Sequence, residues 1–238
     1  MSALREQVAD ARRERVTVVA TDDDTTLPDA YEIQRALFAG RELAGYKLGL
    51  VSPAKRAQMG QDAPVYGHVA PEMVLTTNVV ALDALIQPRF EPEIAVILRR
   101  DVPPGSSAGT VVVAIGATFL AVDILDSVWR DYRFSLPQVV ADNTSGGAFV
   151  LGAHAYDTIP SGRLEVRLDG EVVGSGSLTD IGDPIAHLQW LADDVGGLRA
   201  GQVIFLGSPT AAVDARPGLL EFEGPDGVSL TVRLQPSA

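Results

Sequence analysis

The sequence contains no cysteine. This absence excludes disulfides, zinc held by thiolates, iron–sulfur clusters and thiol nucleophiles. Histidine is also scarce, because His68, His154 and His187 are the only three, and none stands at metal-motif spacing from another. We expect core or surface roles for them. A bound metal ion must therefore be held by oxygen or histidine ligands.

Basic residues are few, with 19 Lys and Arg against 31 Asp and Glu, which gives a formal net charge of -12. Such a surface repels polyanions, so we expect no nucleic-acid partner. No apolar run approaches the roughly 20 residues of a membrane helix, since the stretch 111–122 is interrupted by Gly116. The N-terminus also lacks the pattern of a signal peptide. These absences predict a soluble, cytoplasmic protein with no membrane partner.

The chain is long enough for a sizeable core, with 238 residues of which 46% are apolar. Helical patterns occupy the first quarter, and a capping-box-like start at Thr26 opens the second of them. From Tyr46 onward, short apolar runs separated by Gly, Pro and Asp indicate strands. Helices are expected at 4–15, from 26 to about Gly40 or Gly45, and at 52–59, 108–115 and 184–194. Strands are expected at 46–51, 90–98, 118–125, 149–151, 164–168, 171–174, 203–206, 219–222 and 228–234.

Two turn signals separate pairs of these strands: Asp169-Gly170, and the Pro-Asp-Gly of residues 225–227. No internal repeat or change of composition indicates a second domain. We therefore predict an α+β fold in which residues 1–238 form a single domain. It has a mixed, curled β-sheet, and residues 1–45 form a helical N-terminal arm.

The most informative motif is Glu91-Pro92-Glu93 at the start of an apolar strand. Residues i and i+2 of a strand point to the same face, so the two carboxylates should project side by side. On a buried face they need a divalent cation or a shared proton, and Mg²⁺ or Mn²⁺ suits oxygen ligands. The alternative is a solvated strand edge. Pro92 suggests either an edge strand or the first residues of a strand.

A third carboxylate is available in the apolar run that holds Asp123 and Asp126. An Asp within a buried strand requires a partner, which makes Asp123 the better candidate ligand. Asp126 could instead cap the segment that follows. Either residue could simply pair with Arg130 or Arg133.

Lys47 lies in an otherwise apolar strand, where it either reaches solvent or lines a site and holds a carboxylate or moves a proton. The polar, glycine-rich segment 142–147 could present backbone N–H groups to an anion, or be an ordinary turn. It lacks the lysine of a phosphate-binding loop, and no Gly-x-Ser-x-Gly motif is present. Nucleotide binding and serine hydrolase chemistry are therefore not supported.

Taken together, seven segments in order resemble the fumarylacetoacetate hydrolase superfamily. The chain is most similar to its branch of 2-oxopent-4-enoate hydratases and 4-oxalocrotonate decarboxylases, which act in the catabolism of aromatic compounds. The segments are AYEIQ (30–34), KLGLVSPAK (47–55), QMGQDAPVYG (58–67), EPEI (91–94), DILDS (123–127), VADNTS (140–145) and LGSPTAAV (206–213).

The resemblance implies a fumarylacetoacetate hydrolase-like fold, homo-oligomeric assembly, and Mg²⁺ or Mn²⁺ held by Glu91, Glu93 and Asp123. The family usually has Glu at the third position, so Asp123 shortens that ligand by one methylene. Lys47 matches the catalytic lysine, and it is expected to bind substrate together with Ser145 and Thr210. A partner enzyme of the same pathway is also conceivable.

The function implied is that of a lyase for a small unsaturated 2-oxo acid. The metal would act as a Lewis acid and stabilise a dienolate. The sequences of segments 58–64 and 210–213 are more similar to those of the decarboxylases than to those of the hydratases. This similarity favours a decarboxylase, with a hydratase as the alternative. A non-catalytic relative, or an acylpyruvate hydrolase, is a further alternative. The first is disfavoured by the retained Glu91, Glu93 and Lys47, and the second by the lack of a His-Glu arrangement in the N-terminal part.

Overall fold

The protein is described by a computed structural model that covers residues 3–21, 24–58 and 61–236. Its α-helices are α1 (Ala3–Glu14), α2 (Leu27–Phe38), α3 (Pro53–Gln58), α4 (Ala108–Ala114), α5 (Leu136–Ala141) and α6 (Pro184–Val195). The short 3₁₀ turns within these residues are η1 (Pro71–Met73), η2 (Leu82–Ala84), η3 (Arg130–Tyr132), η4 (Asn143–Ser145), η5 (Leu178–Ile181) and η6 (Pro225–Gly227). Among the described helices, none is both long enough and apolar enough to cross a membrane.

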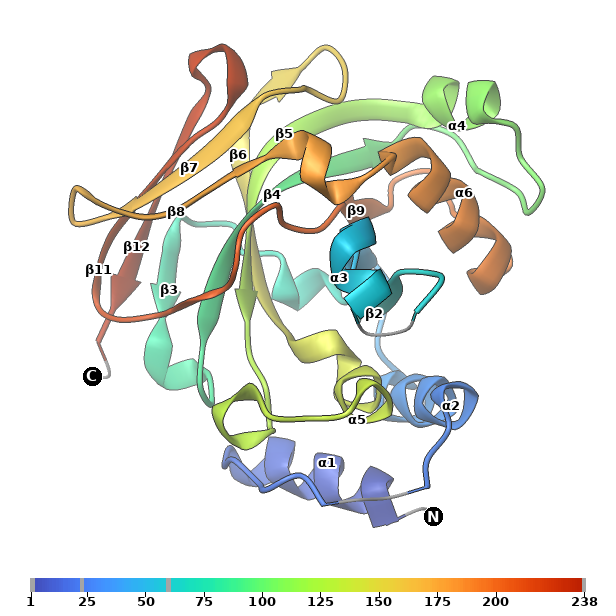
Figure 1. Cartoon of the computed structure of the whole chain (residues 1–238), viewed down its shortest axis with the longest axis vertical. Helices are drawn as coiled ribbons and strands as arrows, with labels where there is room; N and C mark the ends of the chain where they lie inside the picture. The colour runs from blue at the N-terminus through green and yellow to red at the C-terminus, as the bar shows by residue number, and fades with distance from the viewer. Residues whose placement is uncertain (1–2, 22–23, 59–60, 237–238) are drawn as a thin grey trace.

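The strands form two mixed sheets, which confirms the predicted fold class (Figure 1). The larger sheet has the order β2 (Val65–Val69), β1 (Gly45–Gly49), β9 (Val203–Phe205), β4 (Arg89–Leu98), β5 (Ile115–Leu125) and β6 (Gly146–Tyr156), with β10 (Val213–Asp214) also paired to β4. The smaller sheet has the order β3 (Val79–Ala81), β12 (Ser229–Gln235), β11 (Gly218–Glu223), β7 (Arg163–Leu168) and β8 (Glu171–Ser177).

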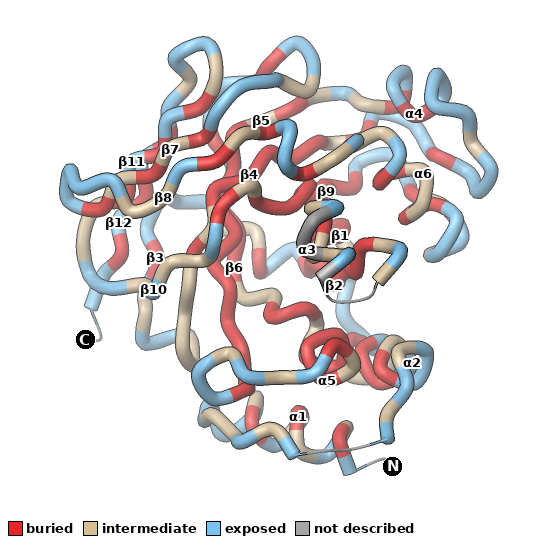
Figure 2. The backbone as a smooth tube through the Cα atoms, in the orientation of Figure 1, coloured by how far each residue is buried: buried red, intermediate tan, exposed pale blue. Residues whose placement is uncertain are grey.

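Strands β4 and β5 are buried on both faces because different elements cover each face (Figure 2). On one face, Ile94, Val96 and Val122 belong to the main core, which also includes residues of β7, β11 and β12 in the smaller sheet. On the other face, Ala95 and Ala121 join a second cluster with aromatic residues of β6 and β9. Because side chains alternate along a strand, the odd-numbered positions of β4 and β5 share this second face.

Helices α1 and α2 pack against α5 through a separate apolar cluster. On α1, the buried side chains Leu4, Val8 and Ala11 form the amphipathic face that the sequence predicted. The capping box at Thr26 is also confirmed, because its side chain accepts from the Asp29 backbone N–H and the Asp29 carboxylate accepts from the Thr26 backbone. The N-terminal helices therefore lie beside α5 and the turn that follows it (Figure 1).

The predicted strands and both predicted hairpin turns are present. Helix α5 and strands β2, β3 and β10 were not expected from the sequence. The predicted helix 52–59 ends at Met59, which lies outside the described residues. Pro92 does not mark an edge strand, because β4 lies inside the sheet. It does stand near the start of β4, which is the other position that the sequence suggested. Pro92 is accommodated at a local gap: β10 pairs with β4 only up to Phe90, and β9 only from Ala95.

Candidate metal centre

The register of β4 and β5 brings three carboxylates together. Glu91 and Glu93 share a face of β4, and Asp123 of β5 lies directly opposite Glu91 in the antiparallel pair. One carboxylate oxygen from each residue lies within 4.8 Å of those of the other two. Glu93 and Asp123 are buried and Glu91 is partly exposed, so the solvated-edge alternative does not describe this cluster.

Burial and mutual repulsion make this cluster costly without a cation. Burial raises the pKa of Glu93 well above its usual value, and the charges of Asp123 and Glu91 raise it further. Burial also raises the pKa of Asp123, whereas the Lys47 ammonium opposes the shift. Three carboxylates with one ammonium leave an excess of negative charge, which a divalent cation would neutralise. The all-oxygen donor set therefore fits Mg²⁺ or Mn²⁺.

Lys47 reaches this cluster from β1, two strands away from β4 in the sheet. Its ammonium lies 2.6 Å from the Asp123 carboxylate, and its side chain is only 3% exposed. The alternative that Lys47 reaches solvent is therefore wrong. A buried ammonium beside the carboxylates is placed to attract an anion or to move a proton.

The loop 206–212 crosses the gap along β4 between its pairings with β9 and β10. At the start of this loop, the Gly207 N–H donates to Glu93 Oε2 at 3.0 Å. Gly207 has φ +87°, and a Cβ there would lie 2.6 Å from a Val51 side-chain carbon, so the position requires glycine. This backbone contact fixes one of the three carboxylates.

A pocket of about 240 Å³ opens beside the cluster. Its polar lining includes Lys47, Glu91, Thr144, Ser145 and Ser208, and its apolar wall comes from β1, α5 and the segment 132–136. The pocket therefore joins a charged end to a wall that excludes water. It is small, which suits a short substrate.

Tyr132 also lines this pocket, and its hydroxyl donates to the Gln87 carbonyl at 3.0 Å. Burial raises the pKa of Tyr132 far above neutral pH, so the phenol stays protonated. The Arg89 guanidinium lies over its ring, 4.1 Å from the centroid. These contacts hold Tyr132 as part of the wall rather than as a base.

Turn η4 brings Thr144 and Ser145 to the pocket in an unusual backbone conformation. Asn143, Thr144 and Ser145 all have φ between 51° and 53°, in the left-handed region that non-glycine residues rarely adopt. Asn143 offsets this cost by pairing with both the N–H and the carbonyl of His68 on β2, at 2.7 and 2.8 Å. The Thr144 hydroxyl donates to the Tyr66 carbonyl at 2.7 Å. Within segment 142–147, Thr144 and Ser145 thus form part of the wall of the pocket.

Gly67 allows this turn to approach β2, since a Cβ there would lie 2.4 Å from the Asn143 carbonyl oxygen. We expect Gly67→Ala to lower the free energy of unfolding by about 1–3 kcal/mol, because two backbone segments would have to separate. Denaturant unfolding measures this loss. Gly109→Ala is a useful comparison, because Gly109 likewise has no positive φ but its Cβ would come no nearer than 3.8 Å to another atom. Equal losses in the two variants would show that contact with η4 is not the cause.

Comparison with known proteins agrees with this geometry. The family model described as fumarylacetoacetate (FAA) hydrolase C-terminal matches residues 44–232. The chain belongs to this family. It is 37% identical over 211 residues to a 4-oxalocrotonate decarboxylase from Pseudomonas sp, covering 83% of this chain and 82% of the relative. It is 32% identical over 200 residues to a 2-hydroxypent-2,4-dienoate hydratase from Pseudomonas putida, covering 78% and 90%.

Among solved structures, this member of the family resembles the 4-oxalocrotonate decarboxylase from Pseudomonas putida G7 complexed with magnesium and adipate. The TM-score is 0.87 with 30% sequence identity, and the match covers 98% of this chain and 96% of that one. The predicted superfamily and fold are therefore confirmed.

The predicted site residues do not all meet in one place. Lys47, Glu91, Glu93, Asp123 and Ser145 lie at the cluster or its pocket. Thr210 follows on the same loop as Gly207 and is buried, but it lines a neighbouring pocket with Arg89. Its role in substrate binding stays a prediction.

The expected partners of the two aspartates need correction: Asp123 pairs with Lys47 and Asp126 with Arg12, instead of Arg130 or Arg133. The histidines play the predicted structural roles. His68 is buried against the Phe38 ring, and burial lowers its pKa to about 4. Gly207 and Tyr132 were not singled out, and Ser208 was considered only as a serine nucleophile and rejected. Gly207 and Ser208 do fall within the matching segment 206–213.

We expect Asp123→Asn to weaken Mg²⁺ binding by about 10-fold or more, because it removes a charge from the cluster. Asp126→Asn is the matched comparison. Its carboxylate is held by Arg12 and by the backbone N–H groups of Ile86 and Gln87, so it should change the affinity far less. Isothermal titration calorimetry of both variants with MgCl₂ shows which substitution weakens Mg²⁺ binding more. A larger loss in Asp126→Asn would move the third ligand to that position.

Proposed function

We propose that this protein is a metal-dependent lyase that acts on a small unsaturated 2-oxo acid. The observation that carries the proposal is the convergence of Glu91, Glu93 and Asp123 beside Lys47 at the charged end of an otherwise apolar pocket. A purely structural role would not require a buried cluster with this excess of negative charge.

The position of each residue in the site indicates its role. Glu91, Glu93 and Asp123 would hold Mg²⁺ or Mn²⁺, which when bound supplies Lewis acidity toward the carboxylate and 2-oxo oxygens of the substrate. Lys47 attracts the substrate carboxylate, and its Nζ can move a proton. Burial beneath the apolar wall strengthens both effects because water does not screen them.

The Ser145 hydroxyl offers a further substrate contact. Its Oγ is buried and has no hydrogen-bond partner within the described part of the chain, yet Ser145 lines the pocket. A buried hydroxyl without a partner is costly, so a substrate oxygen is a natural acceptor. Ser145 would orient the substrate without taking part in bond cleavage.

Decarboxylation of a 4-oxalocrotonate-like acid is the favoured reaction. It is supported by the name of the relative that is 37% identical and by the structural match over nearly the whole chain. Hydration of a 2-oxopent-4-enoate-like acid is the second candidate, because hydratases of similar identity cover a similar share of the chain. Both reactions need the same charged end of the pocket and differ at the distal end of the substrate.

A product assay separates the two reactions. The protein is incubated in Mg²⁺ with either 4-oxalocrotonate or 2-hydroxypent-2,4-dienoate, the dienol form of 2-oxopent-4-enoate, while released CO₂ and loss of the diene absorbance are followed. Release of CO₂ from the first acid supports the decarboxylase. Loss of the diene of the second without CO₂ assigns the hydratase instead, and no reaction with either acid would overturn the proposal.

We also propose the finer properties that the resemblance implies. These are homo-oligomeric assembly, association with an enzyme of the same pathway, and a cytoplasmic location. The division into one domain, residues 1–238, with residues 1–45 as its arm is likewise a proposal. Light scattering of the purified protein tests the assembly, and a mass equal to a single chain would reject it.

A further inference from the structure

The backbone of Ser145 forms hydrogen bonds with the backbones of two aspartates, Asp126 and Asp142. The Asp126 N–H donates to the Ser145 carbonyl at 2.8 Å, and the Ser145 N–H donates to the Asp142 carbonyl at 3.0 Å. The position of the Ser145 hydroxyl in the pocket therefore depends on where these two aspartates are held. Neither aspartate lines that pocket itself, and both line a separate cavity that Arg12 also lines.

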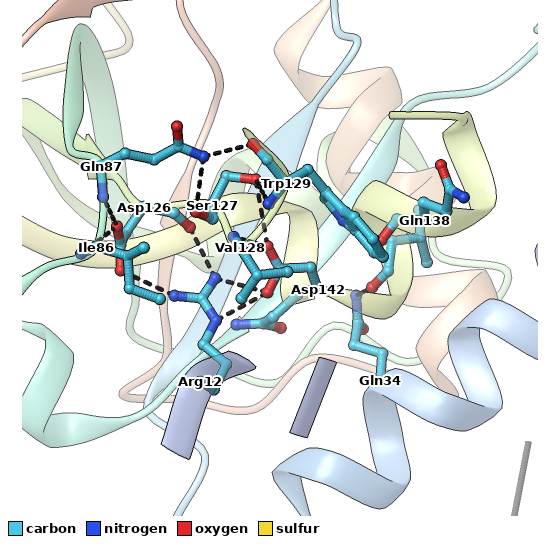
Figure 3. Close-up of polar contacts among 12 residues, drawn as sticks. Arg12, Gln34, Ile86, Gln87, Asp126, Ser127, Val128, Trp129, Gln138 and Asp142 are labelled. Atoms are coloured by element: carbon cyan, nitrogen blue, oxygen red, sulfur yellow. Dashed lines mark hydrogen bonds and ion pairs between the residues drawn. The ribbon is translucent and has the colours of Figure 1, made fainter. Parts of the chain in front are cut away.

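One guanidinium, that of Arg12 on α1, holds both aspartates (Figure 3). Arg12 Nε donates to Asp142 Oδ1 at 2.8 Å, and its terminal nitrogens donate to Asp126 Oδ2 at 2.9 Å and to the Asp126 carbonyl at 2.7 Å. The planar guanidinium can donate hydrogen bonds to both aspartates at once, in a fixed geometry that a lysine ammonium cannot reproduce. Arg12 thus bridges segments 114 and 130 residues away in the chain.

Backbone donors satisfy the other carboxylate oxygens of the two aspartates. Asp142 Oδ2 accepts from the Val128 N–H at 2.9 Å, and Asp126 Oδ1 accepts from the N–H groups of Ile86 and Gln87 at 2.8 and 2.9 Å. The aspartates are therefore oriented on both sides, and the guanidinium closes the network. Asp142 and Asp126 are 1% and 4% exposed, so little water is available to replace Arg12.

We propose that Arg12 is a positioning residue for the substrate pocket, which it serves by fixing Asp126 and Asp142 and, through their backbones, the Ser145 hydroxyl. Arg12 precedes residues 44–232 that the family model matches, so the N-terminal arm completes a pocket built by the family core. The left-handed backbone of η4 explains the need for such a restraint, because this conformation persists only where surrounding contacts impose it.

The competing interpretation is that Arg12 only fastens α1 to the body of the protein. The two interpretations differ in what a conservative change should do. Loss of a fastening would lower thermal stability alone. Loss of a positioning contact would also loosen η4. It would lower turnover as well, but only in a protein in which Ser145 keeps its hydroxyl.

The test uses Arg12→Lys, Ser145→Ala, the double variant, and Arg13→Lys as a control. Arg12→Lys is preferred to Arg12→Ala because it keeps a cation beside two buried carboxylates. Arg13 is the neighbour on the same helix, with a side chain 64% exposed and paired with Asp10. Hydrogen exchange at residues 126–146 is measured first, because it reports on the turn whether or not the protein is a lyase. Steady-state kinetics with saturating Mg²⁺ follow, and these rest on the proposed function.

For Arg12→Lys we expect amide exchange at Asp126 and Ser145 to quicken by about tenfold or more while that of β4 is unchanged. We expect kcat/KM to fall by about tenfold in each single variant, and the double variant to be no worse than about twofold below Ser145→Ala. Arg13→Lys should match the parent in both measurements. Unchanged exchange in Arg12→Lys, or losses that multiply to about 100-fold in the double variant, would overturn the proposal. Absence of turnover in the parent, with the expected exchange result, would overturn only the proposed function.

Discussion

Glu93→Gln is expected to bind Mg²⁺ at least about 100-fold more weakly than the parent and to lose turnover on the order of 10³-fold. Glu93 is the most buried glutamate of the cluster, and the Gly207 N–H fixes its carboxylate. Glutamine keeps the shape and can still accept that hydrogen bond, but it removes the charge. Titration with MgCl₂ and kinetics at saturating Mg²⁺ measure the two losses. Glu91→Gln should behave in the same way.

The stability of Glu93→Gln provides an independent test. Without metal, the substitution removes repulsion among buried carboxylates, so the variant should unfold at or above the temperature of the parent. With Mg²⁺ at 100 times the Kd of the parent, the free energy of unfolding of the parent should rise by about 2.7 kcal/mol, and that of the variant should hardly change. Glu221→Gln, on an exposed position of β11, is the control and should follow the parent. A variant that Mg²⁺ still stabilises fully would exclude Glu93 as a ligand.

Lys47→Met is expected to lower kcat/KM by about 10²-fold or more while Mg²⁺ binds as tightly as in the parent, or more tightly. Lys47 Nζ lies 2.6 Å from the Asp123 carboxylate, so its ammonium would compete with a bound metal ion for that ligand. Removing the ammonium thus relieves repulsion of the cation but also removes the group that attracts the substrate carboxylate. Kinetics and MgCl₂ titration on the same preparation show this separation. A variant within about twofold of the parent in kcat/KM would reduce Lys47 to a structural residue.

Lys47→Arg distinguishes the two roles that remain. Arginine keeps the charge but cannot release a proton at neutral pH. A variant that still binds pyruvate in the presence of Mg²⁺, but does not turn over, assigns proton transfer to Lys47. Full activity confines Lys47 to charge attraction.

The parts of the site that could be predicted from the sequence follow from local periodicity. The spacing of Glu91 and Glu93 fixes a shared face once the segment is a strand, and an Asp inside the apolar run of β5 signals a needed partner. The order of seven motifs supplied the family. The pairing of Lys47 with Asp123 could not be predicted, because it depends on how strands distant in the chain are arranged in the sheet.

The elements that were missed are short or contain a misleading residue. Helix α5 has only six residues, although Ser135 and Gln138 form a capping box that could have indicated it. Strand β2 contains Gly67, which lowers its strand propensity but permits the close approach of η4. The role of Arg12 was hidden for another reason: its partners are distant in sequence, and surface arginines on an amphipathic helix are ordinary.

We expect turnover to depend on a divalent cation held by Glu91, Glu93 and Asp123. The most direct measurement is turnover of an unsaturated 2-oxo acid by chelator-treated protein, before and after titration with MgCl₂. We expect no turnover before the addition and recovery that parallels Mg²⁺ binding at a single site, with no recovery in Glu93→Gln. Full turnover by the metal-stripped parent would contradict the account.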